Sequence, residues 1–152
     1  MKPQLVYNKY KIGTQKLQDV TLLCLRIILA YGFYNPAIMK LKDINAIGDW
    51  FKELGIPLPY INAYIAVGTE IIGLVLIAVG LGTRIIAIPM IIVMLVAIKT
   101  VHWPNGFEAG NNGYEIPLYY ILMLFTLLAF GAGKLSIDGI INFKKRTQMI
   151  VA

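Results

Sequence analysis

Four long runs of apolar residues divide the chain, and polar stretches separate each run from the next. A helix that spans a bilayer needs about 17–25 mostly apolar residues. The first two runs reach that length alone, and the last two reach it with a residue or more of their flanks. The pattern therefore predicts an all-α integral membrane four-helix bundle with short interfacial helices, and its spans are residues 20–39, 60–82, 84–102 and 115–132.

The segments outside these runs are too short for a second domain. We expect a basic arm at residues 1–16, one four-span domain at residues 17–135, and an amphipathic basic tail at residues 136–152. Between the first two spans, residues 44–54 carry apolar side chains at helical spacing, with Asp43 as N-cap and Gly55 at the C-terminal stop. This segment fits a short helix on the membrane interface, or one that covers a cavity between the spans.

The composition excludes a soluble domain. Hydrophobic residues make up 58% of the chain and charged residues only 14%, with a mean hydropathy of +0.69. A soluble domain is roughly 25% charged. The single cysteine, Cys24, excludes an intramolecular disulfide and a CxxC redox pair. The sequence also lacks the phosphate-loop, GxSxG, HExxH and CxxCH motifs, so we expect no haem, flavin or metal and no nucleic-acid partner.

The distribution of lysine and arginine predicts the orientation in the membrane. The termini and the 81–84 turn hold nine such residues, whereas the first loop on the opposite side holds Lys40, Lys42 and Lys52. Cytoplasmic segments carry the excess of positive charge, so both termini are expected in the cytoplasm. The nine residues are Lys2, Lys9, Lys11, Lys16, Arg84, Lys134, Lys144, Lys145 and Arg146.

Two charged residues fall inside the first two spans. Arg26 either snorkels back to the headgroups or pairs with an acid on another helix. Glu70 belongs to a helical stripe of mostly small residues, which lets membrane helices approach closely. Its carboxyl group must be protonated, face Arg26 or line a wet cavity, because an unpaired carboxylate in lipid is costly. We predict an Arg26–Glu70 contact, with either a structural or a proton-handling role. Pro36 should kink the first helix or end it early.

The third and fourth spans are joined by the polar stretch 99–117. Lys99, His102 and Trp103 are spaced to share one helical face, and Glu115 begins the next helix, so that Glu115 is expected to offset the charge of Lys99. In the preceding turn, Thr83 is placed to cap the third span. We also expect a mildly polar stripe of the last helix to turn towards the other helices. Its residues are Glu115, Tyr119, Leu122, Thr126, Ala129 and Gly133.

Together these residues predict a membrane cavity with ionisable and aromatic walls. Such a set suits a quinone, because the ring stacks on aromatic side chains, a carbonyl accepts from His or Lys, and a carboxylate relays the proton. We assign His102 and Glu70 to proton transfer. Trp and Tyr are also ordinary residues of the membrane–water boundary, so the alternative is that the apex residues only anchor the helix ends. The predicted ligand-binding residues are Arg26, Lys99, Trp103, Tyr114, Glu115 and Tyr119.

Several motifs resemble the DoxX family of small four-helix bacterial membrane proteins. The resemblance covers most of residues 20–140, and it lies in Leu25-Arg26, in VGTEIIGLVLIAVGLGTR at 67–84, in HWPNGFEAGNNGYEIPLYY at 102–120 and in FGAGKLSID at 130–138. The chain departs from the pattern in the first span, where many members carry a histidine-glycine and this sequence has Tyr34-Asn35-Pro36.

The resemblance implies a multi-pass protein of the bacterial cytoplasmic (inner) membrane. It implies a quinone-interacting redox subunit that works with a soluble or membrane partner, as in thiosulfate:quinone oxidoreductase or in oxidative- and metal-stress modules. Homo-oligomers are compatible with it. The alternative is a non-enzymatic membrane scaffold or small-solute carrier whose buried charges only hold the helices together.

Overall fold

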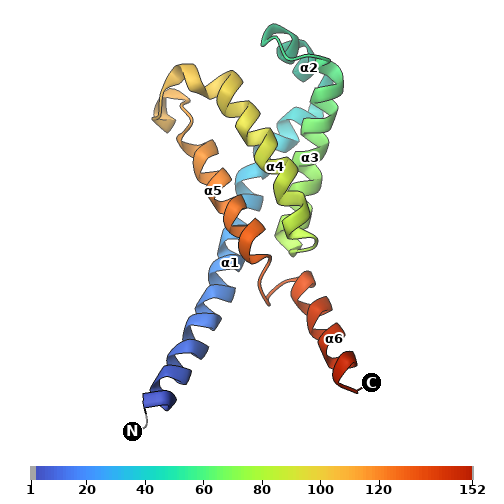
Figure 1. Ribbon diagram of the computed structural model, residues 1–152. Helices are drawn as coiled ribbons and strands as arrows, with labels where there is room; N and C mark the ends of the chain where they lie inside the picture. The colour runs from blue at the N-terminus through green and yellow to red at the C-terminus, as the bar shows by residue number, and fades with distance from the viewer. Residues whose placement is uncertain (1–2, 152) are drawn as a thin grey trace.

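The computed structural model describes the backbone of residues 3–151 and the side chains of residues 13–144. Within that range the chain is helical, with short turns and no strand. Figure 1 shows helices that cross near the middle of the molecule and splay at both ends. They are α1 (Pro3–Lys42), α2 (Ile44–Glu53), α3 (Pro59–Val79), α4 (Thr83–Ala97), α5 (Glu115–Phe130) and α6 (Ile137–Val151).

Within the described residues, three helical segments are long and apolar enough to cross a membrane. They are Gly13–Lys42, Pro59–Val79 and Thr83–Asn105, the last of which continues α4 through a π-helical turn (Ile98–His102) and a 3₁₀ turn (Trp103–Asn105). The prediction of an all-α membrane fold is therefore confirmed. The fourth apolar helix, α5, has 16 residues, so the count of four spans stays a prediction, as does the orientation of the termini.

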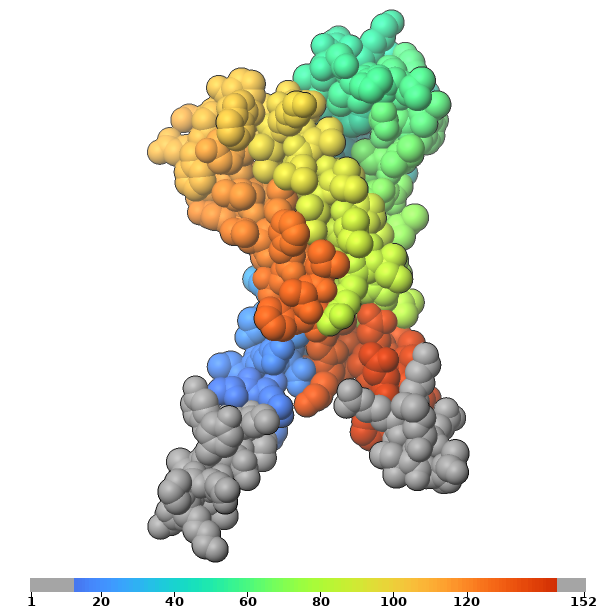
Figure 2. All heavy atoms as spheres, viewed as in Figure 1, coloured from blue at the N-terminus to red at the C-terminus, as the bar shows by residue number. Residues whose placement is uncertain are grey.

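The bundle is built from two helix pairs. α1 packs along α3, α4 packs along α5, and the pairs meet mainly where α3 touches α4. A Cβ atom at Gly73 of α3 would lie only 2.3 Å from Sδ of Met90 on α4, so the glycine permits the close crossing. The core at this crossing is apolar, with Leu29, Ile77 and Leu124 fully buried. In Figure 2 the outer ends of the two pairs form separate lobes with a notch between them.

The first helix is longer than the sequence pattern suggested. α1 begins at Pro3 and runs without interruption past Pro36 to Lys42, so the expected early stop is wrong. Proline costs a helix one hydrogen bond. Phe33 and Ala37, on either side of it, are buried against the bundle, and this packing holds the helix together through the proline. The backbone of the basic arm is helical from Pro3, and its side chains up to residue 12 lie outside the described set.

The short helix α2 follows the prediction closely. Oδ1 of Asp43 accepts a hydrogen bond from the amide of Ala46 at 3.0 Å, and Gly55 takes a left-handed conformation with φ of 72°. α2 packs against α3, where Gly48 lies against the ring of Tyr60. α2 therefore braces the N-terminal end of α3.

The expected buried stripe of the last helix is wrong. α5 buries Pro117, Ile121, Leu124 and Leu127, whereas Tyr119 is exposed. The hydroxyl of Tyr119 donates to Oε1 of Glu115, and the hydroxyl of Thr126 donates to the carbonyl of Leu122. Because these polar groups are satisfied within their own helix, they need no partner on another helix, and apolar packing decides which face is buried.

Candidate functional site

The carboxyl group of Glu70 lies inside the bundle and pairs with a lysine. Glu70 is completely buried in α3, and its Oε1 lies 2.6 Å from Nζ of Lys40, whose side chain is 28% exposed. The second oxygen, Oε2, is buried and has no hydrogen-bond partner among the described residues. The predicted contact between Arg26 and Glu70 is therefore wrong, and Lys40 is the partner that the sequence argument missed.

Lys40 reaches Glu70 by pointing into the membrane-spanning part of the bundle. α1 and α3 are antiparallel, and Arg26 lies beside Ile77 and Ala78. From this level Lys40 is fourteen residues, or about 21 Å, along α1, whereas Glu70 is seven residues, or about 10 Å, along α3. The lysine stem must bridge much of the difference. Lysines near helix ends usually extend towards water. Lys40 instead extends towards the buried Glu70, so the ion pair is a specific contact.

Arg26 stabilises a helix end instead of pairing with an acid. Its Nη1 donates to the carbonyl of Ala78 at 3.0 Å and to that of Ile77 at 3.4 Å, and its Nη2 donates to the carbonyl of Leu135. The last carbonyls of a helix lack partners within the helix and carry partial negative charge. The buried guanidinium satisfies those at the end of α3, so neither the snorkelling arginine nor the acid-paired arginine describes it.

The apex between α4 and α5 is a compact, hydrogen-bonded loop. The amide of Tyr114 donates to the carbonyl of Gly106 at 3.1 Å, and the amide of Glu115 donates to that of Phe107 at 3.0 Å. Nδ1 of His102 lies 2.8 Å from the carbonyl oxygen of Asn112. Because a carbonyl only accepts, Nδ1 carries the hydrogen. In the neutral ring, Nε2 then holds the lone pair and acts as the base.

An aromatic surface lies beside His102. The rings of Trp103 and Tyr114 stack with centroids 5.3 Å apart and planes inclined by 19°, and Phe107 meets Tyr114 edge-on at 5.5 Å. Trp103 nevertheless remains 65% exposed. The apex thus presents an exposed indole ring, which stacks on Tyr114. The residue before it, His102, has one ring nitrogen bonded to the loop.

Glu115 belongs to the apex but does not neutralise Lys99. Its Oε2 accepts the amide of Ala109 at 3.0 Å, and its Oε1 accepts the hydroxyl of Tyr119 at 2.9 Å. Lys99 is exposed and forms no ion pair within the described residues. The π-helical turn at Ile98–His102 also replaces the regular spacing on which the expected shared face of Lys99 and His102 depended.

The predicted site residues therefore lie in three separate places. His102, Trp103, Tyr114, Glu115 and Tyr119 gather at the apex, whereas Arg26 lies at the opposite end of α3 and Glu70 pairs with α1. No group of three or more His, Cys, Asp or Glu that could hold a metal ion occurs in the part of the chain that the structure describes.

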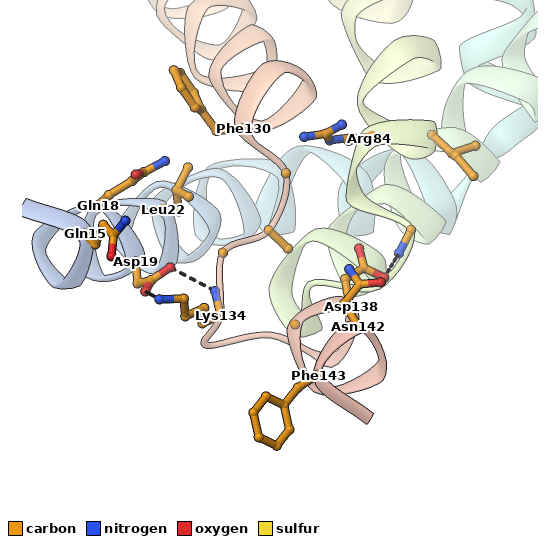
Figure 3. A pocket seen from close by; sticks show the side chains of 16 residues that line it. Gln15, Gln18, Asp19, Leu22, Arg84, Phe130, Lys134, Asp138, Asn142 and Phe143 are labelled. Carbon is orange, nitrogen blue, oxygen red and sulfur yellow. Dashed lines mark hydrogen bonds and ion pairs between the residues drawn. The ribbon is translucent and has the colours of Figure 1, made fainter. Parts of the chain in front are cut away.

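A second set of charged residues, which the sequence argument did not assign, surrounds a cleft at the α6 end of the bundle. Asp19 of α1, Arg84 of α4, Lys134 of the α5–α6 linker and Asp138 of α6 line this cleft (Figure 3). Its volume is about 760 Å³. Asp138 accepts the amides of Gly82 and Thr83 at 3.0 and 3.2 Å. Asp138, and not the expected Thr83, therefore caps α4. The residue that caps α4 lies 55 positions after Thr83, so the spacing of residues near the helix start could not reveal it.

Comparisons with known proteins place the chain in a family. The DoxX family model matches residues 21–103, which is more than half of the sequence. The chain belongs to the DoxX family. An uncharacterized protein of Haemophilus influenzae is 36% identical over 131 residues, which cover 81% of this chain and 84% of the relative. The residues that the family model matches include Arg26, Glu70 and His102, but they end before Tyr114 and Glu115.

Two further relatives are more distant. A Bacillus subtilis protein that carries the name "Putative oxidoreductase CatD" is 29% identical over 120 residues, or 79% of this chain and 78% of the relative. An uncharacterized membrane protein of Mycobacterium tuberculosis is 29% identical over 130 residues, or 78% of this chain and 79% of the relative. No solved structure matches this chain.

Proposed function

We propose that this DoxX protein is a quinone-interacting redox subunit of the bacterial cytoplasmic membrane. The observation that carries the proposal is the apex, where the exposed indole of Trp103 stacks on Tyr114 and the preceding residue, His102, is bonded to the carbonyl of Asn112. A quinone head group is a flat ring with polar oxygens at its edge. The Trp103 face suits the ring, and Nε2 of His102 suits an oxygen or its proton.

The chain's own residues would bind the ring and move protons. With Nδ1–H fixed on Asn112, neutral His102 takes a proton at Nε2 from a quinol hydroxyl, and in the imidazolium form it returns one to a quinone oxygen. Interconversion of quinone and quinol also needs two electrons, which a partner protein supplies or accepts. The family relative named as an oxidoreductase supports a redox role of this general kind.

The proposal predicts that the indole of Trp103 contributes to quinone binding. We expect Trp103→Leu to weaken the binding of a short-chain quinone by about tenfold, because stacking on an aromatic ring is worth on the order of 1 kcal/mol or more. The measurement is a titration of purified, detergent-solubilised protein. Trp50→Leu is the matched control, because Trp50 is another exposed indole but lies on α2. Equal binding by Trp103→Leu and wild type would remove the proposed ring contact.

A scaffold without redox activity is the second candidate, and the α6 end of the bundle favours it. There, Arg26 satisfies the end of α3, Asp138 caps α4 and Arg84 donates to the carbonyl of Ala129 at the end of α5. These charges hold helix ends together. If the protein is a scaffold, changes at the apex should reduce the amount of folded protein, and they should have no specific effect on quinone binding.

A further inference from the structure

The cleft at the α6 end combines a polar wall with an apolar one. α1 contributes Gln15, Gln18 and Asp19, and α6 contributes Asp138 and Asn142. The opposite rim is formed by Ile85 of α4 and Phe130 of α5, which are 77% and 60% exposed. Since α4 belongs to a candidate span and Phe130 ends the apolar helix α5, this rim faces the bilayer, and the cleft lies at the membrane boundary.

The acidic residues of the cleft are already neutralised. Oδ1 of Asp19 accepts the amide of Lys134 at 3.0 Å, and its Oδ2 lies 3.6 Å from Nζ of the same lysine. Both oxygens of Asp138 are taken by the first amides of α4, where the helix dipole adds positive potential. Both carboxylates are therefore held by groups other than Arg84.

Arg84 is the charge of the cleft without a counter-ion. Its Nη2 donates to the carbonyl of Ala129 at 3.0 Å, and within the described residues no carboxylate lies in ion-pair range of it. A guanidinium has five N–H donors, so most of them remain available. The side chain is held in place beside Gly131, where a Cβ atom would lie 3.3 Å from Nε and φ is 78°.

An apolar groove continues from the cleft along the helices. It has a volume of about 410 Å³, shares Gly82, Ile85 and Asp138 with the cleft, and extends past Leu76, Ile86 and Pro89 of α3 and α4. An unpaired cation at the membrane boundary is therefore joined to an apolar channel on the lipid-facing side.

We propose that the cleft and groove form a binding site for an anionic phospholipid of the surrounding bilayer. Arg84 binds the phosphate through charge-assisted hydrogen bonds, the side-chain amides of Gln15, Gln18 and Asn142 face the polar headgroup, and one acyl chain follows the groove. A free anion would leave the groove unused, and an apolar molecule would leave the guanidinium unpaired. The site is separate from the apex and does not depend on the proposed quinone chemistry.

Lipid retention by the full-length protein tests this site. Detergent-solubilised protein is titrated with phosphatidylglycerol, with phosphatidylcholine or with inorganic phosphate, and native mass spectrometry measures the bound fraction. We expect wild type to prefer phosphatidylglycerol to phosphatidylcholine. Arg84→Gln should lower the affinity for phosphatidylglycerol about tenfold, which is the low end for a hydrogen bond to a charged group. Lys144→Gln, which removes an exposed cation outside the cleft at the same end, should change it less than about twofold.

Three outcomes would overturn the proposal. They are equal retention of the two phospholipids by wild type, unchanged phosphatidylglycerol affinity in Arg84→Gln, and displacement of the lipid by inorganic phosphate at a similar concentration, which would indicate a site for soluble anions. Arg84→Lys keeps the charge and should retain most of the affinity. If Arg84→Gln folds poorly, Arg84→Lys becomes the test. Loss of the preference for phosphatidylglycerol in Arg84→Lys would then contradict the assignment.

Discussion

The two ends of the bundle use their charged residues differently. At the α6 end, Arg26, apart from its Nε, and the carboxylates of Asp19 and Asp138 are engaged by backbone groups of other elements. Arg84 is the exception at that end, because only one of its donors is engaged in the described residues. Towards the apex end, Oε2 of Glu70 has no partner among the described residues, and His102 makes a bond through only one ring nitrogen. Charges that complete helix ends stabilise the fold, whereas groups with unused hydrogen-bonding capacity are the better candidates for chemistry.

The largest effect on stability is expected from the Lys40–Glu70 pair. Lys40→Met should lower the free energy of unfolding by about 3–5 kcal/mol, because it leaves a buried carboxylate uncompensated. The double variant Lys40→Met with Glu70→Gln should recover much of that loss. Unfolding in detergent, followed by circular dichroism, measures both, and single effects that simply add would argue against the contact.

A smaller loss, of about 3 kcal/mol, is expected for Arg26→Met, because the carbonyls of Ala78 and Leu135 lose their donor and that of Ile77 keeps only the amide of Gly80. Combined with Glu70→Gln, this change should be additive, since the two side chains make no contact. The same unfolding measurement applies. A coupling of more than about 0.5 kcal/mol would show that the contacts of Arg26 and Glu70 do not act separately.

Most of the fold could be predicted, because it depends on the spacing of apolar and small residues. The spacing in the second span predicts a stripe of Ala63, Ala66, Glu70, Gly73, Ile77 and Gly80, and all of these except Ala66 are buried; Val67 is buried in its place. The helix α2 could be predicted from its caps. These signals lie within one or two helical turns, so the sequence alone reveals them.

The site could be predicted only in part, because its contacts join distant segments. Ending the first span at residue 39 placed Lys40 in the loop that follows, so the pair with Glu70 had no geometric basis in the sequence. The π-helical turn before His102 and the capping of α4 by Asp138 are also decided by tertiary packing. The sequence did allow one cluster to be predicted, because a short loop brings its two ends together. This cluster consists of His102, Trp103, Tyr114 and Glu115.

The most direct test of the account is quinone binding and turnover by His102→Gln. Glutamine can still donate a hydrogen bond to the carbonyl of Asn112, but it cannot titrate near neutral pH. In purified protein supplied with a short-chain quinone and an artificial electron donor, we expect little change in stability. Quinone turnover should fall about tenfold or more. Unchanged binding and turnover, or loss of the folded protein, would contradict the proposed role and leave His102 as an anchor of the apex loop.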